Sequence, residues 1–140
     1  MRKFYPTFSQ LRNKSILVVE DDEIWRLTIA EWLSFIGAHV SHVDSAQHAQ
    51  RALGVMKFDL IITDIVLKGG NGFLFAEAIR DTGCECPIIG ISSDSERYEE
   101  MSKVFGLEGF MQKPLDKDAF IYKVCELTNS LSPKIDDILN

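Results

Sequence analysis

Short apolar runs, rich in β-branched residues, alternate along the chain with stretches of helical periodicity. The runs occupy residues 15–19, 38–43, 59–63, 87–91 and 109–112. Several are apolar on both faces, as in parallel strands that helices cover on both sides. Between them, apolar residues recur at helical spacing, as at Trp25 and Ile29, and cap-forming residues such as Asp44 and Ser45 precede helical stretches. The pattern predicts an α/β domain with a five-stranded parallel sheet and five helices.

Polar residues follow the expected strands at the point where each strand ends. They are Glu20, Asp21 and Asp22 after the first run, Asp64 after the third, Ser92 after the fourth and Lys113 after the fifth. Ligands of such sheets bind outside the carboxyl ends of the strands. We therefore expect these side chains to converge on one site.

The residue types at this edge indicate phosphoryl chemistry. Converging carboxylates raise one another's pKa unless a cation neutralises them, and carboxylate oxygens suit Mg²⁺. The amine of Lys113 and the hydroxyl of Ser92 can contact phosphate oxygens, while Asp64 can attack phosphorus as a nucleophile. The expected product is an aspartyl phosphate.

The chain resembles the response regulator receiver domain family of two-component signalling. The matching segments are Ile-Leu-Val-Val-Glu20-Asp21-Asp22, Ile-Ile-Thr-Asp64 with Gly72 eight residues later, Ile-Ser92-Ser93, and Phe110-Met-Gln-Lys113-Pro114. Each motif is short, but the four occur in the family's order over residues 15–131. The resemblance implies a flavodoxin-like, doubly wound sheet of order 2-1-3-4-5, with the first and third strands adjacent at the switch point.

Residue roles follow from the resemblance. It implies that Asp64 is the phosphoacceptor, Lys113 its phosphoryl partner, Ser92 the switch hydroxyl and Phe110 the rotating aromatic. The implied Mg²⁺ cofactor would be held by Asp21 and Asp64, by Glu20 through bound water, and by the backbone carbonyl of Val66. The resemblance also implies that the Lys113-Pro114 bond is cis, and a bond before proline is where the cis isomer costs least free energy.

The resemblance also implies partners. A sensor histidine kinase, a phosphotransfer protein or a small phosphodonor would supply the phosphoryl group, and the domain would catalyse only its own phosphorylation and dephosphorylation. Output would come from the fourth helix, fifth strand and fifth helix, with phosphorylation-dependent homodimerisation left open. That surface includes Tyr98, Met101, Lys103, Phe110 and Tyr122. A receiver excised from a transcription factor or hybrid kinase remains an alternative.

The same residues allow other interpretations. Asp21 and Asp22 could cap a helix, Asp64 could lie in a turn and Lys113 could be a loop cation, but five such coincidences at one sheet edge are improbable. A haloacid dehalogenase-like phosphohydrolase also uses an aspartate nucleophile, but it needs a second Asp where this chain has Val66. A degenerate receiver usually lacks one of the five site residues, and all are present here.

The loop after Asp64 departs from the family's usual Met-Pro. It reads Ile65, Val66, Leu67 and Lys68, so its shape is not predicted. Hydrolysis of a phosphorylated Asp64 requires a water held in line with the phosphoryl bond. The Val66 side chain cannot hydrogen-bond this water, and the Asp94 carboxylate could either orient the water or repel the phosphoryl group. Since we give Val66 more weight, we expect a long-lived phosphorylated form.

Composition and charge limit the classes of function that the chain can have. The 140 residues carry a net charge of −6, which argues against direct nucleic-acid binding. No apolar run suits a membrane span or signal peptide, so a cytoplasmic location is expected. Residues 1–14 form a basic segment expected to be a solvated extension, and residues 132–140 a tail or linker stub.

The cysteines fit a reducing compartment. Cys84 and Cys86 are separated by one residue, which is too close for an easy disulfide. The sequence has no second Cys pair or His pair at a spacing that would complete a zinc site. His39 and His42 fall on opposite faces of the second strand and cannot readily share a metal.

Overall fold

The computed structural model describes residues 4–94 and 96–132, and its elements alternate as the sequence predicts. The strands are β1 (Ser15–Val19), β2 (His39–Val43), β3 (Leu60–Asp64), β4 (Val66–Leu67), β5 (Gly70–Asn71), β6 (Ile88–Ser92) and β7 (Gly109–Gln112). The helices are α1 (Glu23–Phe35), α2 (Ala46–Val55), α3 (Gly72–Asp81), α4 (Glu96–Val104) and α5 (Lys117–Leu127).

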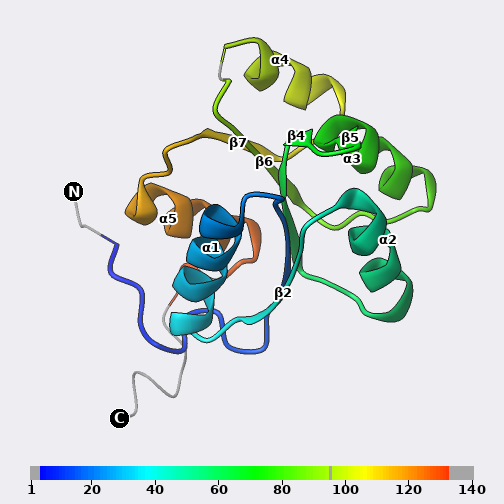
Figure 1. Ribbon diagram of the computed structural model, residues 1–140. Coiled ribbons are helices and arrows are strands. Elements are labelled where there is room, and N and C mark those ends of the chain that lie inside the picture. The colour runs from blue at the N-terminus through cyan, green and yellow to red at the C-terminus, as the bar shows by residue number, and fades with distance from the viewer. Residues whose placement is uncertain (1–3, 95, 133–140) are drawn as a thin grey trace.

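Five strands form one parallel sheet in the order β2-β1-β3-β6-β7 (Figure 1). This is the predicted order 2-1-3-4-5, because β4 and β5 form a separate antiparallel pair. The pair closes the loop after Asp64, whose shape the sequence left open. The flavodoxin-like, doubly wound fold is therefore confirmed.

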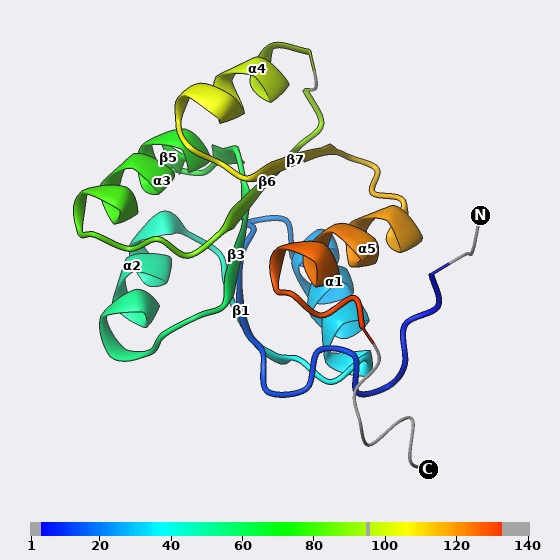
Figure 2. The same ribbon diagram turned by 180° about the vertical axis from the view of Figure 1, so that it is seen from behind.

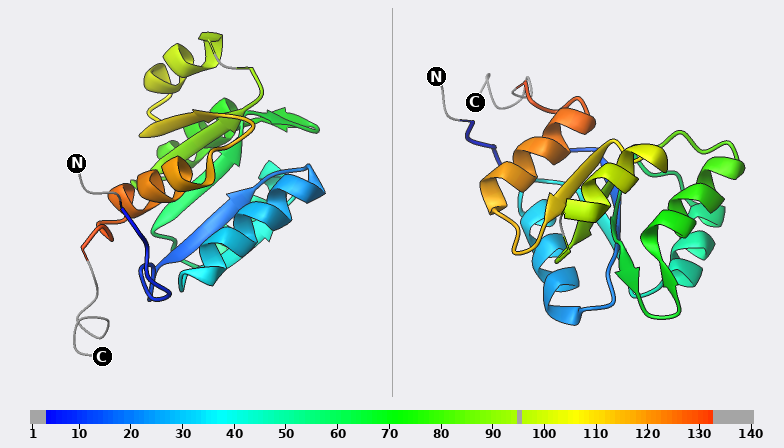
Figure 3. Two further views of the ribbon diagram at one scale, coloured as in Figure 1. Left: turned by 90° about the vertical axis from the view of Figure 1, so that its left-hand side faces the viewer. Right: turned by 90° about the horizontal axis from the view of Figure 1, so that it is seen from above.

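Helices cover both faces of the sheet, as Figures 2 and 3 show from other sides. On one face α1 and α5 bury Ile29, Leu33 and Phe120 against the strands. On the other face α2, α3 and α4 pack around a second apolar cluster, which includes Phe73 and Ile79 of α3. This two-sided burial explains why the central strands are apolar throughout.

Side chains at the helix starts set where the chain turns back from the sheet edge. The carboxylate of Asp22 accepts hydrogen bonds from the backbone N–H groups of Ile24 and Trp25, and Ser45 and Asn71 cap α2 and α3 in the same way. The interpretation as a helix cap is therefore right for Asp22. Asp21 does not cap the helix.

The expectation of a solvated N-terminal extension is wrong for residues 9–11. Leu11 is fully buried in the cluster beneath α1 and α5, and its N–H donates to the carbonyl of Ile36 at 2.8 Å. The buried Gln10 amide donates to the carbonyls of Ser130 and Ser132. Apolar burial of Leu11 thus ties the segment to the domain (Figure 2). Residues 133–140, in the expected tail, lie outside the described residues.

Within the described part of the chain, the helices are too short and too polar for any of them to traverse a bilayer.

Candidate functional site

The carboxyl edge of the sheet carries the polar residues that the sequence pattern singles out. Asp64 is the last residue of β3 and Ser92 the last of β6, while Glu20 follows β1 and Lys113 follows β7. Glu20 and Ser92 are almost fully buried, and Asp64 is 6% exposed. The neighbouring strands β1, β3, β6 and β7 therefore place these four side chains at one end of the sheet.

Lys113 joins two of the carboxylates. Its Nζ lies 2.6 Å from Oδ2 of Asp64 and 2.7 Å from Oε2 of Glu20. The Lys113-Pro114 bond is cis, as predicted. The contact of Lys113 with Oε2 of Glu20 is an ion pair that lacks hydrogen-bond geometry. Oε2 of Glu20 therefore makes no hydrogen bond with the described residues. One buried oxygen of the site is thus available to a ligand.

Burial and charge act in opposite directions on these groups. Burial raises the pKa of Glu20 to about 7, against the lowering effect of the Lys113 amine. Burial disfavours the charge on Lys113, but its contacts with Asp64 and Glu20 outweigh burial and raise the pKa of the amine. Glu20 is thus incompletely neutralised, which a cation would correct.

The acidic residues are arranged as a hard cation requires. One carboxylate oxygen each from Glu20, Asp21 and Asp64 lie within 4.8 Å of one another. Backbone N–H groups hold two of these carboxylates: Val66 donates to Oδ1 of Asp64 and Lys68 donates to Oδ2 of Asp21, both at 2.9 Å. Oxygen donors with one unsatisfied buried atom fit a divalent cation such as Mg²⁺.

The structure places the two predicted switch residues differently from each other. Oγ of Ser92 accepts the N–H of Asp94 at 3.1 Å, which leaves the hydroxyl proton free to be donated elsewhere. Phe110 is half-buried in the apolar cluster under α3 and α4 and lies opposite Gly90 in the sheet. It is therefore not one of the side chains that ring the carboxylates.

Three further contacts surround the site; those of Arg26 and Lys68 were not predicted from the sequence, whereas the position of Trp25 close to the acidic loop left a shielding role and a helix-packing role open. The Trp25 ring lies 6.0 Å from Nζ of Lys113, Arg26 donates to the carbonyl of Glu20 at 3.1 Å, and the N–H of Lys68 holds Asp21. Trp25 belongs to the apolar stripe of α1 and packs against the core, while Arg26 resembles any polar residue on a helix surface. The contact of Lys68 is made by its backbone, which carries no side-chain signal.

Comparisons with known proteins agree on the family of this arrangement. The family model for the response regulator receiver domain matches residues 16–124. Regulator of RpoS from Escherichia coli is 33% identical over 107 residues, covering 75% of this chain and 32% of that protein. The autoinducer 1 sensor kinase/phosphatase LuxN from Vibrio campbellii is 26% identical, covering 79% of this chain and 13% of that protein. The chain thus spans about a third or less of these two relatives.

Solved structures show the same fold. The non-phosphorylated HemR receiver domain from Leptospira biflexa superposes with a TM-score of 0.77 at 25% identity, covering 87% of this chain and 99% of that one. A two-component response regulator from Clostridium difficile superposes with a TM-score of 0.80 at 21% identity, covering 86% of this chain and all of that one.

Proposed function

The chain belongs to the response regulator receiver domain family, and we propose that it is switched by Mg²⁺-dependent phosphorylation of Asp64. Receiver domains act in two-component signalling and are generally not enzymes toward other substrates. Residues 15–131 are the proposed receiver, with residues 1–14 as an N-terminal extension and 132–140 as a tail or linker. The proposed phosphodonor is a sensor histidine kinase or phosphotransfer protein.

The observation that carries the proposal is the contact between Lys113 and Asp64. The Asp64 carboxylate is 6% exposed and its Oδ2 lies 2.6 Å from the ammonium of Lys113, so one oxygen of the proposed nucleophile is held by an ion pair. Its other oxygen is fixed by the N–H of Val66. The nucleophile is therefore oriented before any phosphodonor arrives.

Asp21, Asp64 and the Val66 carbonyl are the proposed metal ligands, with Glu20 holding metal-bound water. The chemistry supplied by Mg²⁺ at such a site is neutralisation of phosphate oxygens. Only oxygen donors are involved, in agreement with the preference of Mg²⁺ for carboxylates and water.

In the proposed transfer, an Asp64 oxygen forms a bond to phosphorus as the bond from phosphorus to the donor breaks. The electron pair leaves with the donor, an imidazole nitrogen of a kinase or the carboxylate of acetyl phosphate. Lys113 stabilises the negative charge on the phosphoryl oxygens during transfer. The product is an acyl phosphate on Asp64.

The new charge would act on Ser92 and Phe110. Because the Ser92 oxygen already accepts the Asp94 N–H, its own proton can be donated to a phosphoryl oxygen, which would draw the loop after β6 inward. Phe110 would then turn into the space that this loop vacates, a shift between two packings. The surface of α4, β7 and α5 would change for a downstream partner.

Turnover on an external substrate is disfavoured by Val66. A haloacid dehalogenase-like enzyme needs a general acid two residues after its nucleophile. Val66 is apolar there and contributes to the site through its backbone N–H. The phosphoryl group is therefore expected to remain on Asp64 until water attacks.

The test is phosphorylation by acetyl phosphate, followed by intact mass. With Mg²⁺ we expect one added phosphoryl group, and none in EDTA or in Asp64→Asn. Asp81→Asn, which changes an exposed aspartate at the end of α3, is the matched control and should be phosphorylated as the parent is. An adduct in EDTA, or an undiminished adduct in Asp64→Asn, would contradict the proposal.

Metal binding can be measured separately through Trp25. Because its ring lies 6.0 Å from Lys113, Mg²⁺ should change tryptophan fluorescence as the amine's charge contacts are redistributed. Trp25→Phe, which leaves Trp32 as the chain's remaining tryptophan, should lose that change. An Mg²⁺ response in Asp21→Asn equal to that of the parent would contradict the proposed ligand set.

A further inference from the structure

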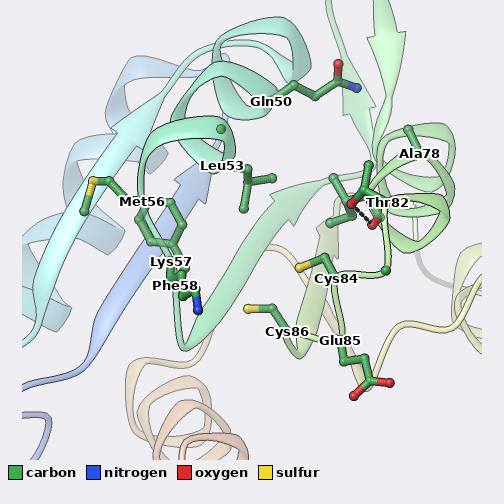
Figure 4. Close-up of a pocket in the computed structure, with 13 residues that line it drawn as sticks. Gln50, Leu53, Met56, Lys57, Phe58, Ala78, Thr82, Cys84, Glu85 and Cys86 are labelled. Carbon is green, nitrogen blue, oxygen red and sulfur yellow. Dashed lines mark hydrogen bonds between the residues drawn. The ribbon is translucent and has the colours of Figure 1, made fainter.

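A cavity of about 820 Å³ lies at the amino end of the sheet, away from the carboxylates. It is bounded by the C-terminal parts of α2 and α3 and by the segments that precede β3 and β6 (Figure 4). Leu53, Phe58 and Ile79 give it an apolar lining. A volume of this size suits a small organic molecule.

Two thiols stand on one side of this cavity. Cys84 and Cys86 are half-buried, and both sulfur atoms point into the cavity in Figure 4. Burial, followed by the nearness of Cys84, raises the pKa of Cys86 to about 12, so this group is a neutral thiol at physiological pH. Sulfur ligands offer little to a hard cation, which prefers charged oxygen ligands.

The backbone that carries the thiols is held in place by Arg80. Its Nη1 donates to the carbonyl of Cys84 at 2.9 Å and to that of Cys86 at 2.7 Å. Its Nη2 donates to both carboxylate oxygens of Glu108, and Glu108 also accepts the N–H of Ile88 at 2.7 Å. The positions of the two cysteines are therefore set by contacts outside the cavity, before a ligand binds.

We propose that this cavity binds trivalent aryl arsenicals, with arsenic bridging the sulfur atoms of Cys84 and Cys86 and the aryl group against Leu53, Phe58 and Ile79. A soft centre such as As(III) prefers sulfur ligands, and two thiols one residue apart can chelate it. The apolar lining favours an arsenical that carries an aryl group over a small hydrophilic one. The site is independent of Asp64.

The bonding step balances without an oxidant. Two As–O bonds of an aryl arsonous acid break and two As–S bonds form. Each thiol proton leaves with one oxygen, so two water molecules are released. Arsenic stays trivalent and neither sulfur is oxidised. Because the protons leave during the exchange, a thiol that is neutral beforehand, such as that of Cys86, can take part.

The first experiment measures binding of phenylarsonous acid to the reduced chain by intact mass and by competition with ethanedithiol. We expect one phenylarsenic group per chain, and affinity at least about 100-fold weaker in Cys84→Ser and in Cys86→Ser, because each variant loses chelation. Cys125→Ala, at a buried cysteine of the other core cluster, is the control and should bind as the parent does. Parent-like affinity in either serine variant overturns the proposal.

The second experiment tests the cavity itself. Methylarsonous acid has the same thiol chemistry without the ring, so the affinity ratio of phenyl to methyl is compared with the ratio for free ethanedithiol. We expect the chain to raise this ratio about tenfold through burial of the ring, and Leu53→Gln to remove most of the increase. A ratio equal to that of ethanedithiol overturns the proposal. Asp64→Asn should bind both arsenicals as the parent does, which separates this site from the phosphoacceptor.

Discussion

The two ends of strands β3 and β6 differ in charge and polarity. At the carboxyl end, the ammonium of Lys113 is paired with Glu20 and Asp64, and Asp21 adds a third carboxylate beside them. At the amino end, the strands begin beside an apolar cavity with thiols, and the nearby charges of Arg80 and Glu108 are paired with each other at 3.0 Å. The carboxyl end therefore carries an excess of buried negative charge, whereas the charged pair described at the amino end is balanced.

The difference shows where the fold accepts an unfavourable arrangement. Buried charges without full compensation reduce stability, and natural proteins concentrate such arrangements at functional sites. The Arg80–Glu108 pair satisfies backbone groups of its own loop, so it serves structure. Among the described residues, the carboxylate cluster leaves Oε2 of Glu20 without a hydrogen bond, so the cluster is better suited to a ligand than to stability.

The largest effect should follow from removing the shared cation. Lys113→Met leaves Glu20 and Asp64 buried without a counter-charge, and we expect the free energy of unfolding in EDTA to fall by about 3 kcal/mol. Denaturant unfolding at neutral pH measures it, with Lys117→Met, at an exposed lysine of α5, as the control. Added Mg²⁺ should recover part of the loss. Unchanged stability would mean that the carboxyl end is not held by this ion pair.

A smaller effect should appear as a pH dependence. The folded pKa of Glu20 is raised to about 7, so the folded state binds this proton more tightly than the unfolded state. In EDTA, the contribution of Glu20 should therefore reduce stability as pH rises from about 4.5 to about 7 and level off above that. Glu20→Gln should remove this component.

The same measurement sharpens the comparison of the two ends. Because the pKa of Cys86 is raised to about 12, replacing it should leave the pH profile of stability unchanged over this range. Unfolding free energies of Glu20→Gln and Cys86→Ser, measured across pH against the parent, separate the two contributions. A parent-like slope in Glu20→Gln would show that another group carries the dependence.

A loss of about 1–2 kcal/mol is expected from Arg80→Met, which removes hydrogen bonds to the carbonyls of Cys84 and Cys86. Binding of Mg²⁺ should not change, because Arg80 lies at the other end of the strands. Denaturant unfolding and Trp25 fluorescence measure the two quantities in the same samples. A weakened Mg²⁺ response would show that the two ends are coupled.

The fold and the gathering of the site residues could be predicted because they depend on local patterns. Doubly apolar runs such as that ending at Asp64 report burial on both faces, and the connection rules of parallel sheets bring their ends together. The cis bond before Pro114 was predicted from the family resemblance, at the one kind of bond where the cis isomer costs little. These signals lie within a few residues of the groups that they position.

What the sequence did not reveal depends on long-range packing. Leu11 is buried against residues of α1 and α5, and one leucine in a basic, aromatic segment without helical or strand periodicity does not indicate this. The β4–β5 pair joins residues across a turn without an alternating pattern. The cavity beside Cys84 and Cys86 arises where α2 and α3 end, and the bond from Arg80 to that loop joins groups that no motif connects.

The smallest expected effect concerns the lifetime of the phosphorylated form, and it tests whether the carboxyl end limits access of water. Val66 is 55% exposed, and its N–H holds Oδ1 of Asp64, which fixes its backbone next to this carboxylate. Its isopropyl group offers no hydrogen bond, and we expect it to hinder the approach of water. In Val66→Asn the amide can orient a water for attack, and we expect the phosphoryl half-life to shorten roughly three- to tenfold, equivalent to about 1 kcal/mol in the barrier. Decay of the phosphorylated chain after removal of acetyl phosphate measures it, with Leu74→Asn, at an exposed leucine of α3, as the control. If Val66→Asn decays as slowly as the parent or more slowly, water access at this position does not control lifetime, and the charge of Asp94 becomes the next group to change.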